Sequence, residues 1–300
     1  MTAELHPTPD HVSGDPGDWL LGVRTPRSDL PPNAMRHYLA ACLATAALGM
    51  ACTSFLIGPR ILAVAAACAG TALLVELLFA RVRRKPLNGG GLIYGLVLAL
   101  LLPSDIPLEM AALGAAIACL FGKEVFGGTG SQIFAPVLVG KAALVFGYPG
   151  RIKGAGFSSL AADADPRLML ALALISLIAV VLMGLARPAN LRVLGAALVA
   201  AVCVAIPLHQ MELLRAAGIV ELLLANSFLL SICLIACDPA TTPRDDEAKW
   251  LYGLLLGSLA TLMACFSTYE EAAMSAILVA NLFAPTLDLL AKPRREEAAA

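Results

Sequence analysis

Residues 38–57 read YLAACLATAALGMACTSFLI, and residues 61–80 read ILAVAAACAGTALLVELLFA. Each run is long enough to cross the hydrocarbon core of a bilayer as an α-helix, which takes about 20 apolar residues. Between them stand only Gly58, Pro59 and Arg60, a composition typical of a tight turn. The stretch therefore predicts two consecutive membrane-spanning helices.

The composition of the whole chain supports the same class. Of the 300 residues, 59% are hydrophobic and 14% are charged, and the mean hydropathy is +0.81. Soluble domains are about 45–50% apolar and about 25% charged, so a soluble fold and a disordered chain are both excluded. The 21 Lys and Arg balance the 22 Asp and Glu, which predicts no nucleic-acid partner. No Cys-x-x-Cys pair occurs, so we expect no zinc or other metal site.

Eight further apolar runs bring the expected number of membrane segments to ten. They are 91–102, 108–121, 132–148, 168–186, 193–208, 219–237, 250–266 and 272–290. The first two of these runs are short, which is typical of broken or re-entrant helices. Irregular backbone at membrane depth must lie inside protein or line a cavity. The sequence thus predicts an all-α polytopic membrane protein with about ten transmembrane segments, some of them short or broken.

The distribution of Lys and Arg predicts the orientation. If the ten segments alternate from a cytoplasmic N-terminus, most basic residues near segment ends fall on the cytoplasmic side, as the positive-inside rule requires. Residues 1–34 then form a cytoplasmic arm, and residues 291–300 form a cytoplasmic tail. The arm does not read as a signal peptide, because no apolar run follows a basic start. The membrane domain is expected to cover residues 35–290.

Two short phrases recur in the same order in both halves of this domain. LPSD at 102–105 is echoed by CDP at 237–239, and IFAP at 133–136 by LFAP at 282–285. Ten segments divide into five and five, and an odd number per half gives the halves opposite orientations. We therefore expect two inverted five-helix repeats, residues 35–148 and 168–290, joined by an outer loop at 149–167. The functional site of such folds lies between the repeats, where helices break.

Seven charged residues lie in or beside the apolar runs, where a central charge costs about 2.5–3.5 kcal/mol on insertion scales. They are Glu76, Lys123, Glu124, Lys141, Glu221, Asp238 and Asp288. Arg81 and Arg83 follow Glu76 within two turns, and Lys292 follows Asp288 by four residues, so we interpret Glu76 and Asp288 as members of structural ion pairs.

The other charged residues keep two interpretations. Lys123 and Glu124 either neutralise each other or line a pathway, and Asp238 either caps a loop or has a functional role. Glu221 has no partner nearby in sequence, which makes it a candidate ion ligand or an interfacial residue.

Gly127, Gly128 and Gly130 form a glycine-rich turn directly after this Lys-Glu pair. Glycine permits positive φ angles and a close approach of the backbone. The turn is not a phosphate-binding P-loop, because no Gly-Lys-Ser/Thr follows. At membrane depth it is expected to line a cavity or to contact another subunit. We predict that the candidate pathway residues gather at the cleft between the repeats: Lys123, Glu124, Gly127, Gly128, Gly130, Glu221 and Asp238.

The stretch 123–136, KEVFGGTGSQIFAP, resembles the signature of the RnfD/NqrB family of membrane subunits. The segments 238–241 and 269–288 resemble two further motifs of that family, and the matches spread from about residue 88 to residue 290, with an interruption in the middle. It implies a ten-span, inverted-repeat subunit of a redox-driven pump in the bacterial inner membrane. Such a complex moves electrons between NADH and ferredoxin or quinone and couples this to Na⁺ or H⁺ movement. Its other integral membrane and peripheral redox subunits would be the partners of this chain.

The resemblance also implies FMN, linked by a phosphoester to a threonine in the outer loop. The corresponding loop here, residues 147–167, is short and contains no threonine. Ser158 and Ser159 are the nearest candidate anchors, because a serine hydroxyl can form the same bond. The glycine motif also departs from the family pattern at Gln132, Ile133 and Ala135. These departures indicate a divergent member that has lost or rebuilt its flavin site; FMN stays a candidate cofactor, without an expectation of covalent attachment.

Three functions are therefore open from the sequence. The first is a non-autonomous subunit of an electron-transfer complex, and no catalytic residue is predicted in this chain. The second is a channel or secondary transporter, because broken segments, an inverted repeat and intramembrane acids suit it equally. The third is a flavin-free structural subunit of another membrane or biosynthetic system.

Overall fold

The computed structural model describes residues 33–56, 58–84, 87–149, 166–213, 228–266 and 269–299. Every regular element within these ranges is a helix. The elements are α1 (Ala34–Leu56), α2 (Arg60–Arg83), α3 (Gly90–Leu101), α4 (Leu108–Cys119), η2 (Leu120–Glu124), α5 (Pro136–Gly147), α6 (Pro166–Ala186), α7 (Asn190–Gln210), α8 (Phe228–Ser231), η4 (Ile232–Ala236), α9 (Asp246–Ala264) and α10 (Tyr269–Ala299). Candidate residues Ser158, Ser159 and Glu221 lie outside the described ranges.

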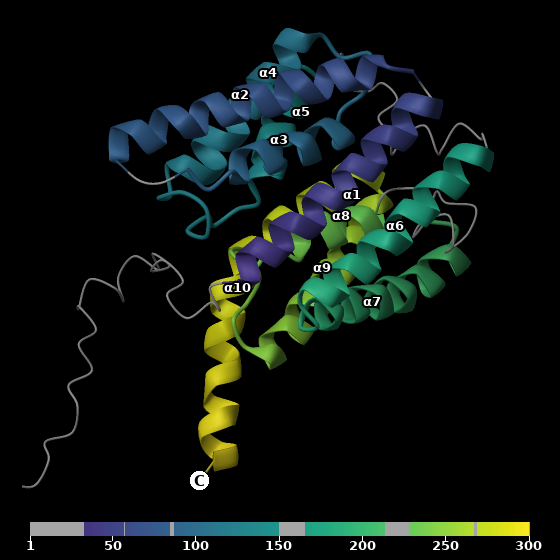
Figure 1. Ribbon diagram of the computed structural model, residues 1–300. Helices are drawn as coiled ribbons and strands as arrows, with labels where there is room; N and C mark the ends of the chain where they lie inside the picture. Colours follow the sequence, from purple (N-terminus) through teal and green to yellow (C-terminus); the bar gives the residue numbers. More distant parts are fainter. Residues whose placement is uncertain are drawn as a thin grey trace, which may run out of the picture.

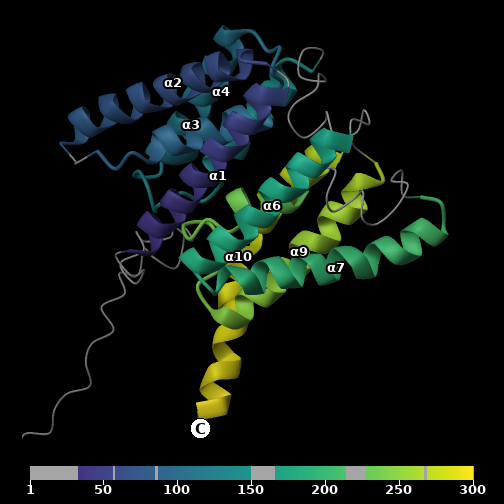
Figure 2. The same ribbon diagram turned by 45° about the vertical axis from the view of Figure 1, so that its right-hand side comes forward.

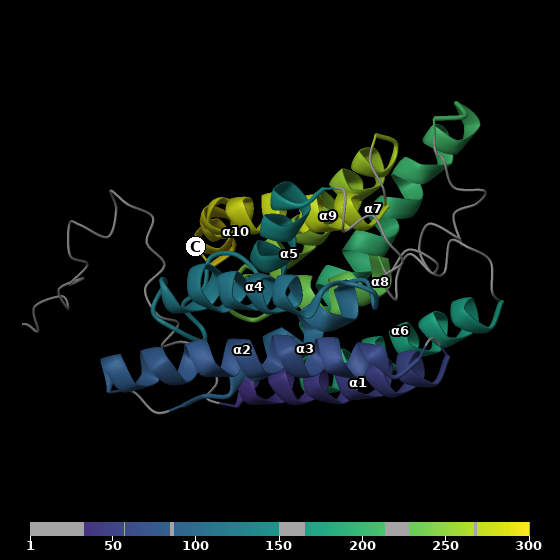
Figure 3. The same cartoon turned by 90° about the horizontal axis from the view of Figure 1, so that it is seen from above.

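The helices pack in two groups that α1 connects (Figure 1). In one group α2 packs on α3 and α4, and α4 packs on α5; in the other, α9 packs between α7 and α10. Helix α1 packs against both α3 and α6. Viewed from above, α1 and α2 run along one side and α9 and α10 along the other (Figure 3). The last part of α10 extends beyond the other helices (Figure 2).

Four helical stretches are long and apolar enough to cross a membrane: Ala34–Leu56, Arg60–Arg83, Asn190–Gln210 and Glu271–Ala291. The two runs that read as short, 91–102 and 108–121, form α3 and α4, which have 12 residues each. Large apolar side chains point away from the bundle; Phe55, Leu185 and Phe266 are 89%, 78% and 87% exposed. Such surfaces suit hydrocarbon rather than water. The chain is a multi-pass membrane protein.

Small residues let the helix backbones come close together. Gly95 of α3 faces α2, and a Cβ there would lie 2.7 Å from the carbonyl oxygen of Cys68. Gly257 of α9 is pressed against the backbone of Ala197 in α7, and Gly253 against that of Val193. Association of helices in lipid depends on such close packing, because lipid tails are as apolar as the side chains. The α7–α9 contact is therefore set by glycines spaced four residues apart.

Gly257→Ala is expected to lower the free energy of unfolding by about 1–3 kcal/mol, because the added methyl group forces two backbones apart. Gly195→Ala is the matched control in α7, since a Cβ at Gly195 meets no atom of the described residues within 4 Å. Denaturant titration of the purified protein in detergent checks both variants. Equal stability of the two would show that the α7–α9 contact is looser than described.

Candidate functional site

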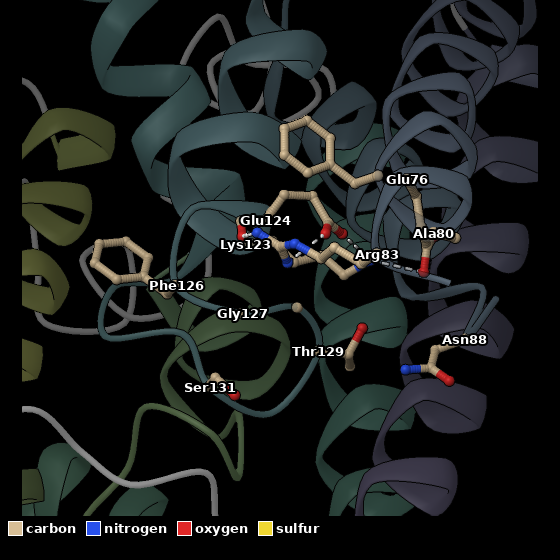
Figure 4. Close-up of a pocket in the computed structure, with 12 residues that line it drawn as sticks. Glu76, Ala80, Arg83, Asn88, Lys123, Glu124, Phe126, Gly127, Thr129 and Ser131 are labelled. Atoms are coloured by element: carbon tan, nitrogen blue, oxygen red, sulfur yellow. Dashed lines mark hydrogen bonds and ion pairs between the residues drawn. The ribbon is translucent and has the colours of Figure 1, made fainter. Parts of the chain in front are cut away.

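A cavity of about 290 Å³ lies between the end of α2, the segment before α3, and the chain that follows α4. Glu76 and Arg83 of α2 line it, together with Asn88, Lys123, Glu124 and Thr129. Figure 4 shows the four charged side chains together and Thr129 and Asn88 beside them. The glycine-rich turn completes the wall with Gly127 and Gly128.

A π-turn brings Lys123 and Glu124 to this cavity. Helix α4 continues past Cys119 as η2 (Leu120–Glu124), and the Val125 N–H donates to the Leu120 carbonyl at 2.9 Å. A π-turn inserts one residue into the helical repeat and is frequent at functional sites. The turn after it needs glycine, because Gly127, Gly128 and Gly130 have φ angles of 115°, 105° and 98°.

The charged side chains form a chain of ion pairs, buried except at Arg83. Lys123 Nζ lies 2.7 Å from Glu76 Oε1 and 3.2 Å from Glu124 Oε1, although it is aligned for a hydrogen bond with neither. Arg83 Nη1 lies 3.3 Å from Glu124 Oε2, and the guanidinium carbon of Arg83 stands 5.1 Å from the ring centre of Phe79. Lys123, Glu76 and Glu124 are 1%, 4% and 5% exposed. Two acids and two bases make the cluster neutral, which is how buried charge is tolerated.

The expected pairing of Glu76 with Arg81 or Arg83 is wrong. Arg83 lies two turns further along α2 and pairs with Glu124, while Glu76 pairs with Lys123. The second carboxylate oxygen of Glu76 accepts the Gly91 N–H at 2.7 Å, at the start of α3. Glu76 thus ties α2, α3 and the π-turn together, a tertiary role that local spacing does not reveal.

A second buried polar cluster surrounds Asp238, directly after η4 (Ile232–Ala236). Asp238 Oδ2 accepts hydrogen bonds from the Tyr94 hydroxyl at 3.0 Å and from Gln132 Nε2 at 2.8 Å. Asp238 Oδ1 accepts the Ala240 N–H at 2.8 Å, so the carboxylate also shapes its own loop. Asp238 is 1% exposed and Gln132 is fully buried. The Leu234 carbonyl of η4 accepts the Tyr38 hydroxyl of α1 at 2.6 Å, which ties η4 to α1.

The two clusters are linked by two short segments. Gly91, bonded to Glu76, and Tyr94, bonded to Asp238, stand three residues apart on α3 and hence on one helix face. Along the loop, the Gly130 N–H donates to Gln132 Oε1 at 3.3 Å, which connects the glycine turn to Asp238. The two polar clusters thus lie next to each other along α3 and the loop at 130–132, and Asp238 comes from the second half of the chain.

The structure places six of the residues that the sequence singled out at two sites, and every residue that lines the cavity belongs to the first half of the chain, so the cavity is not at the expected cleft between the repeats. Lys123, Glu124, Gly127 and Gly128 line the cavity, while Gly130 and Asp238 meet through Gln132. Sequence reasoning missed Tyr94 and Tyr38 as polar partners, and it treated Gln132 only as a departure from a motif. Asp288 accepts the N–H groups of Arg244 at 2.6 Å and Asp245 at 3.2 Å, which joins α10 to the start of α9. The Lys292 side chain lies outside the described part, so its pairing with Asp288 stays a prediction.

A sequence model described as the NQR2, RnfD, RnfE family matches residues 31–296. The chain belongs to the NQR2, RnfD, RnfE family. The resemblance read from the glycine-rich motif is thereby confirmed.

The curated relatives are named as one subunit of a Na⁺-translocating NADH-quinone reductase. The protein of Pseudomonas aeruginosa (strain UCBPP-PA14) is 30% identical over 256 residues, which cover 71% of this chain and 62% of the relative. That of Klebsiella pneumoniae (strain 342) is 30% identical over 264 residues, covering 72% and 62%. That of Neisseria meningitidis serogroup B is 28% identical over 254 residues, covering 71% and 62%. The chain thus spans less than two thirds of the length of these relatives.

Proposed function

We propose that this chain is a membrane subunit of a redox-driven complex that couples electron transfer to the translocation of Na⁺ or H⁺. The family supports this, because relatives are named for Na⁺ translocation driven by NADH–quinone reduction. The observation that carries the proposal is the presence of two buried polar clusters, at Lys123 and at Asp238, in a membrane protein, where buried ionisable residues are typical of ion pathways. Other integral membrane and peripheral redox subunits would supply and accept the electrons.

The cavity beside Lys123 is the proposed ion-binding site. Carboxylate and hydroxyl oxygens are the preferred ligands of hard cations, and the cavity offers them from Glu76, Glu124 and Thr129. The Thr129 hydroxyl is buried and has no hydrogen-bond partner among the described residues. A cation that reaches Glu124 competes with Lys123, whose ammonium group is 0.5 Å nearer to Glu76 (3.2 Å against 2.7 Å). Lys123 can release Glu124 and stay paired with Glu76, so entry of a cation leaves no buried base unpaired.

Asp238 is the proposed second ion-binding site of the pathway. Tyr94 and Gln132 hold its Oδ2 atom, and both belong to the first half of the chain. Movement of the halves relative to each other would change these two contacts first. Glu221 remains a further candidate ligand, proposed from sequence alone.

We also propose that the two groups of helices are inverted repeats, α1–α5 and α6–α10. The same helix contacts recur in the two groups. The α2–α4 and α4–α5 contacts of one group correspond to the α7–α9 and α9–α10 contacts of the other. The Asp238 loop follows the third helix of the second group, as residues 102–105 follow α3 in the first. The orientation with both termini in the cytoplasm follows from the charge distribution of the sequence.

If this chain binds FMN, we propose that the flavin acts at the outer loop that contains Ser158 and Ser159. That loop lies outside the described part of the chain, and the ion pathway proposed above uses none of its residues. When bound, a flavin would pass electrons to or from partner subunits.

A denatured band of this protein is expected to show no flavin fluorescence on a gel, because the loop at 147–167 lacks the threonine that carries FMN in the family. The undenatured complex is nevertheless expected to show the absorbance of a redox cofactor. A fluorescent band that darkens in Ser158→Ala or Ser159→Ala would reveal a serine-linked flavin instead. A complex with no chromophore at all would count against the proposed electron-transfer role.

A further inference from the structure

Away from the proposed ion pathway, the turn between α6 and α7 meets the start of α9. The turn is tight, since the Arg187 N–H donates to the Met183 carbonyl and the Asn190 N–H to the Arg187 carbonyl, both at 3.0 Å. Close packing of α7 on α9 places Arg192 near the first turn of α9. There Asp246 pairs with Arg192 and, at 2.7 Å, with Lys249.

The turn at residues 187–190 and the start of α9 that it meets are here called the corner. Two hydrogen-bond donors at this corner have no acceptor within the described part of the chain. Arg187 Nη1 and Asn190 Nδ2 are both buried and have no hydrogen-bond partner there. Asn190 is only 3% exposed. Buried donors are nearly always paired in folded proteins, and two donors left open at one turn point to an acceptor that the described residues do not supply.

The charged groups around the turn indicate whether that acceptor is neutral or negatively charged. Three bases, Arg187, Arg192 and Lys249, surround one carboxylate, Asp246. Hydrogen bonds from Lys249 and Arg192 lower the pKa of Asp246 to about 2, so its charge is fully present at neutral pH. Asp245 and Glu247 stand beside Asp246 and balance the charge of the region, but among the described residues no carboxylate pairs with Arg187, whose guanidinium favours an anionic ligand over a neutral one.

The position of the corner relative to the membrane indicates whether the anion is a lipid headgroup or a free anion in solution. Arg187 follows the apolar helix α6 directly, and Lys249 comes directly before Trp250, which is 48% exposed. Exposed Trp beside Lys or Arg is typical of the level of lipid headgroups. Leu185 and Leu191 are 78% and 46% exposed on either side of the turn and offer apolar surface to acyl chains. A free anion in solution would use the donors but not these leucines.

We propose that this corner binds the headgroup phosphate of an anionic phospholipid, with Arg187 and Asn190 as donors and Arg192 and Lys249 as further positive charges. The acyl chains lie along Leu185 and Leu191. The site is separate from the ion pathway, and its occupancy does not depend on electron transfer.

Native mass spectrometry of the full-length chain in detergent tests this site by titration with phosphatidylglycerol and with phosphatidylcholine of the same acyl chains. Tighter binding of phosphatidylglycerol is expected, and Arg187→Gln should weaken it about tenfold, the effect of one lost charge-assisted hydrogen bond. Arg81→Gln removes an exposed arginine at the end of α2 and should leave binding unchanged.

Equal binding of the two lipids by the unmodified protein would overturn the proposal, whether or not the variants fold. Equal losses in Arg187→Gln and Arg81→Gln would overturn it as well, by showing that only overall charge matters. Inorganic phosphate is the third probe: displacement of phosphatidylglycerol by phosphate at comparable concentration would show a general phosphate site and contradict the assignment to lipid.

Discussion

Glu124→Gln is expected to lower ion uptake per transferred electron about tenfold or more, while electron transfer itself continues. The substitution keeps the shape of the side chain and removes the charge that a cation would meet in the cavity. Loss of a hydrogen bond or contact to a charged group costs about 1.5–3 kcal/mol, which corresponds to this factor. The variant should still fold, because Lys123 keeps Glu76 and Arg83 is partly exposed to solvent.

The measurement uses vesicles that contain the assembled complex and records ion uptake and electron-donor oxidation in parallel. Glu109→Gln is the matched control, since Glu109 is an exposed glutamate in the first turn of α4. A Glu124→Gln complex that transports as many ions per electron as the Glu109→Gln complex would remove Glu124 from the pathway.

Glu76→Gln is expected to cost about 3–5 kcal/mol of stability, the usual effect of removing one partner of a buried ion pair. Glutamine can still accept the Gly91 N–H, so the loss reports on the charge rather than on the helix contact. Lys123→Met should destabilise by a similar amount, because it leaves two buried carboxylates close to each other.

The double variant Glu76→Gln with Lys123→Met should be more stable than the sum of the single effects predicts. It removes both charges of one pair, and Glu124 keeps Arg83. Unfolding in detergent by denaturant titration gives the four free energies of this cycle. Strictly additive losses would show that Glu76 and Lys123 are not coupled, and the ion-pair chain would then be wrong.

The sequence predicts most of the helices, because apolar runs of about 20 residues have few alternatives in a membrane protein. It also predicts the short segments and the glycine turn, since a broken apolar run and clustered glycines are local features. The arrangement of the polar groups is different. Glu76 has two arginines near it in sequence, yet its partner Lys123 comes from another helix. No local spacing predicts such a contact.

The Asp238 cluster shows the same limit of local reasoning. Tyr94 lies in an apolar run and reads as a core aromatic residue, and Gln132 reads as a departure from a motif. Only the folded chain shows that both bind Asp238. The π-turns η2 and η4 were not predicted either, because an inserted residue in a helix is stabilised by tertiary contacts such as the one from Tyr38 to Leu234.

We propose that ions move through this subunit only when electrons move through its complex. Ion flux into vesicles tests this most directly, measured once with the purified chain alone under an imposed ion gradient, and once with the assembled complex and an electron donor. We expect no flux through the chain alone and uptake by the complex that starts when the donor is added. Rapid flux through the chain alone without an electron donor would contradict this coupling and identify a channel or secondary transporter.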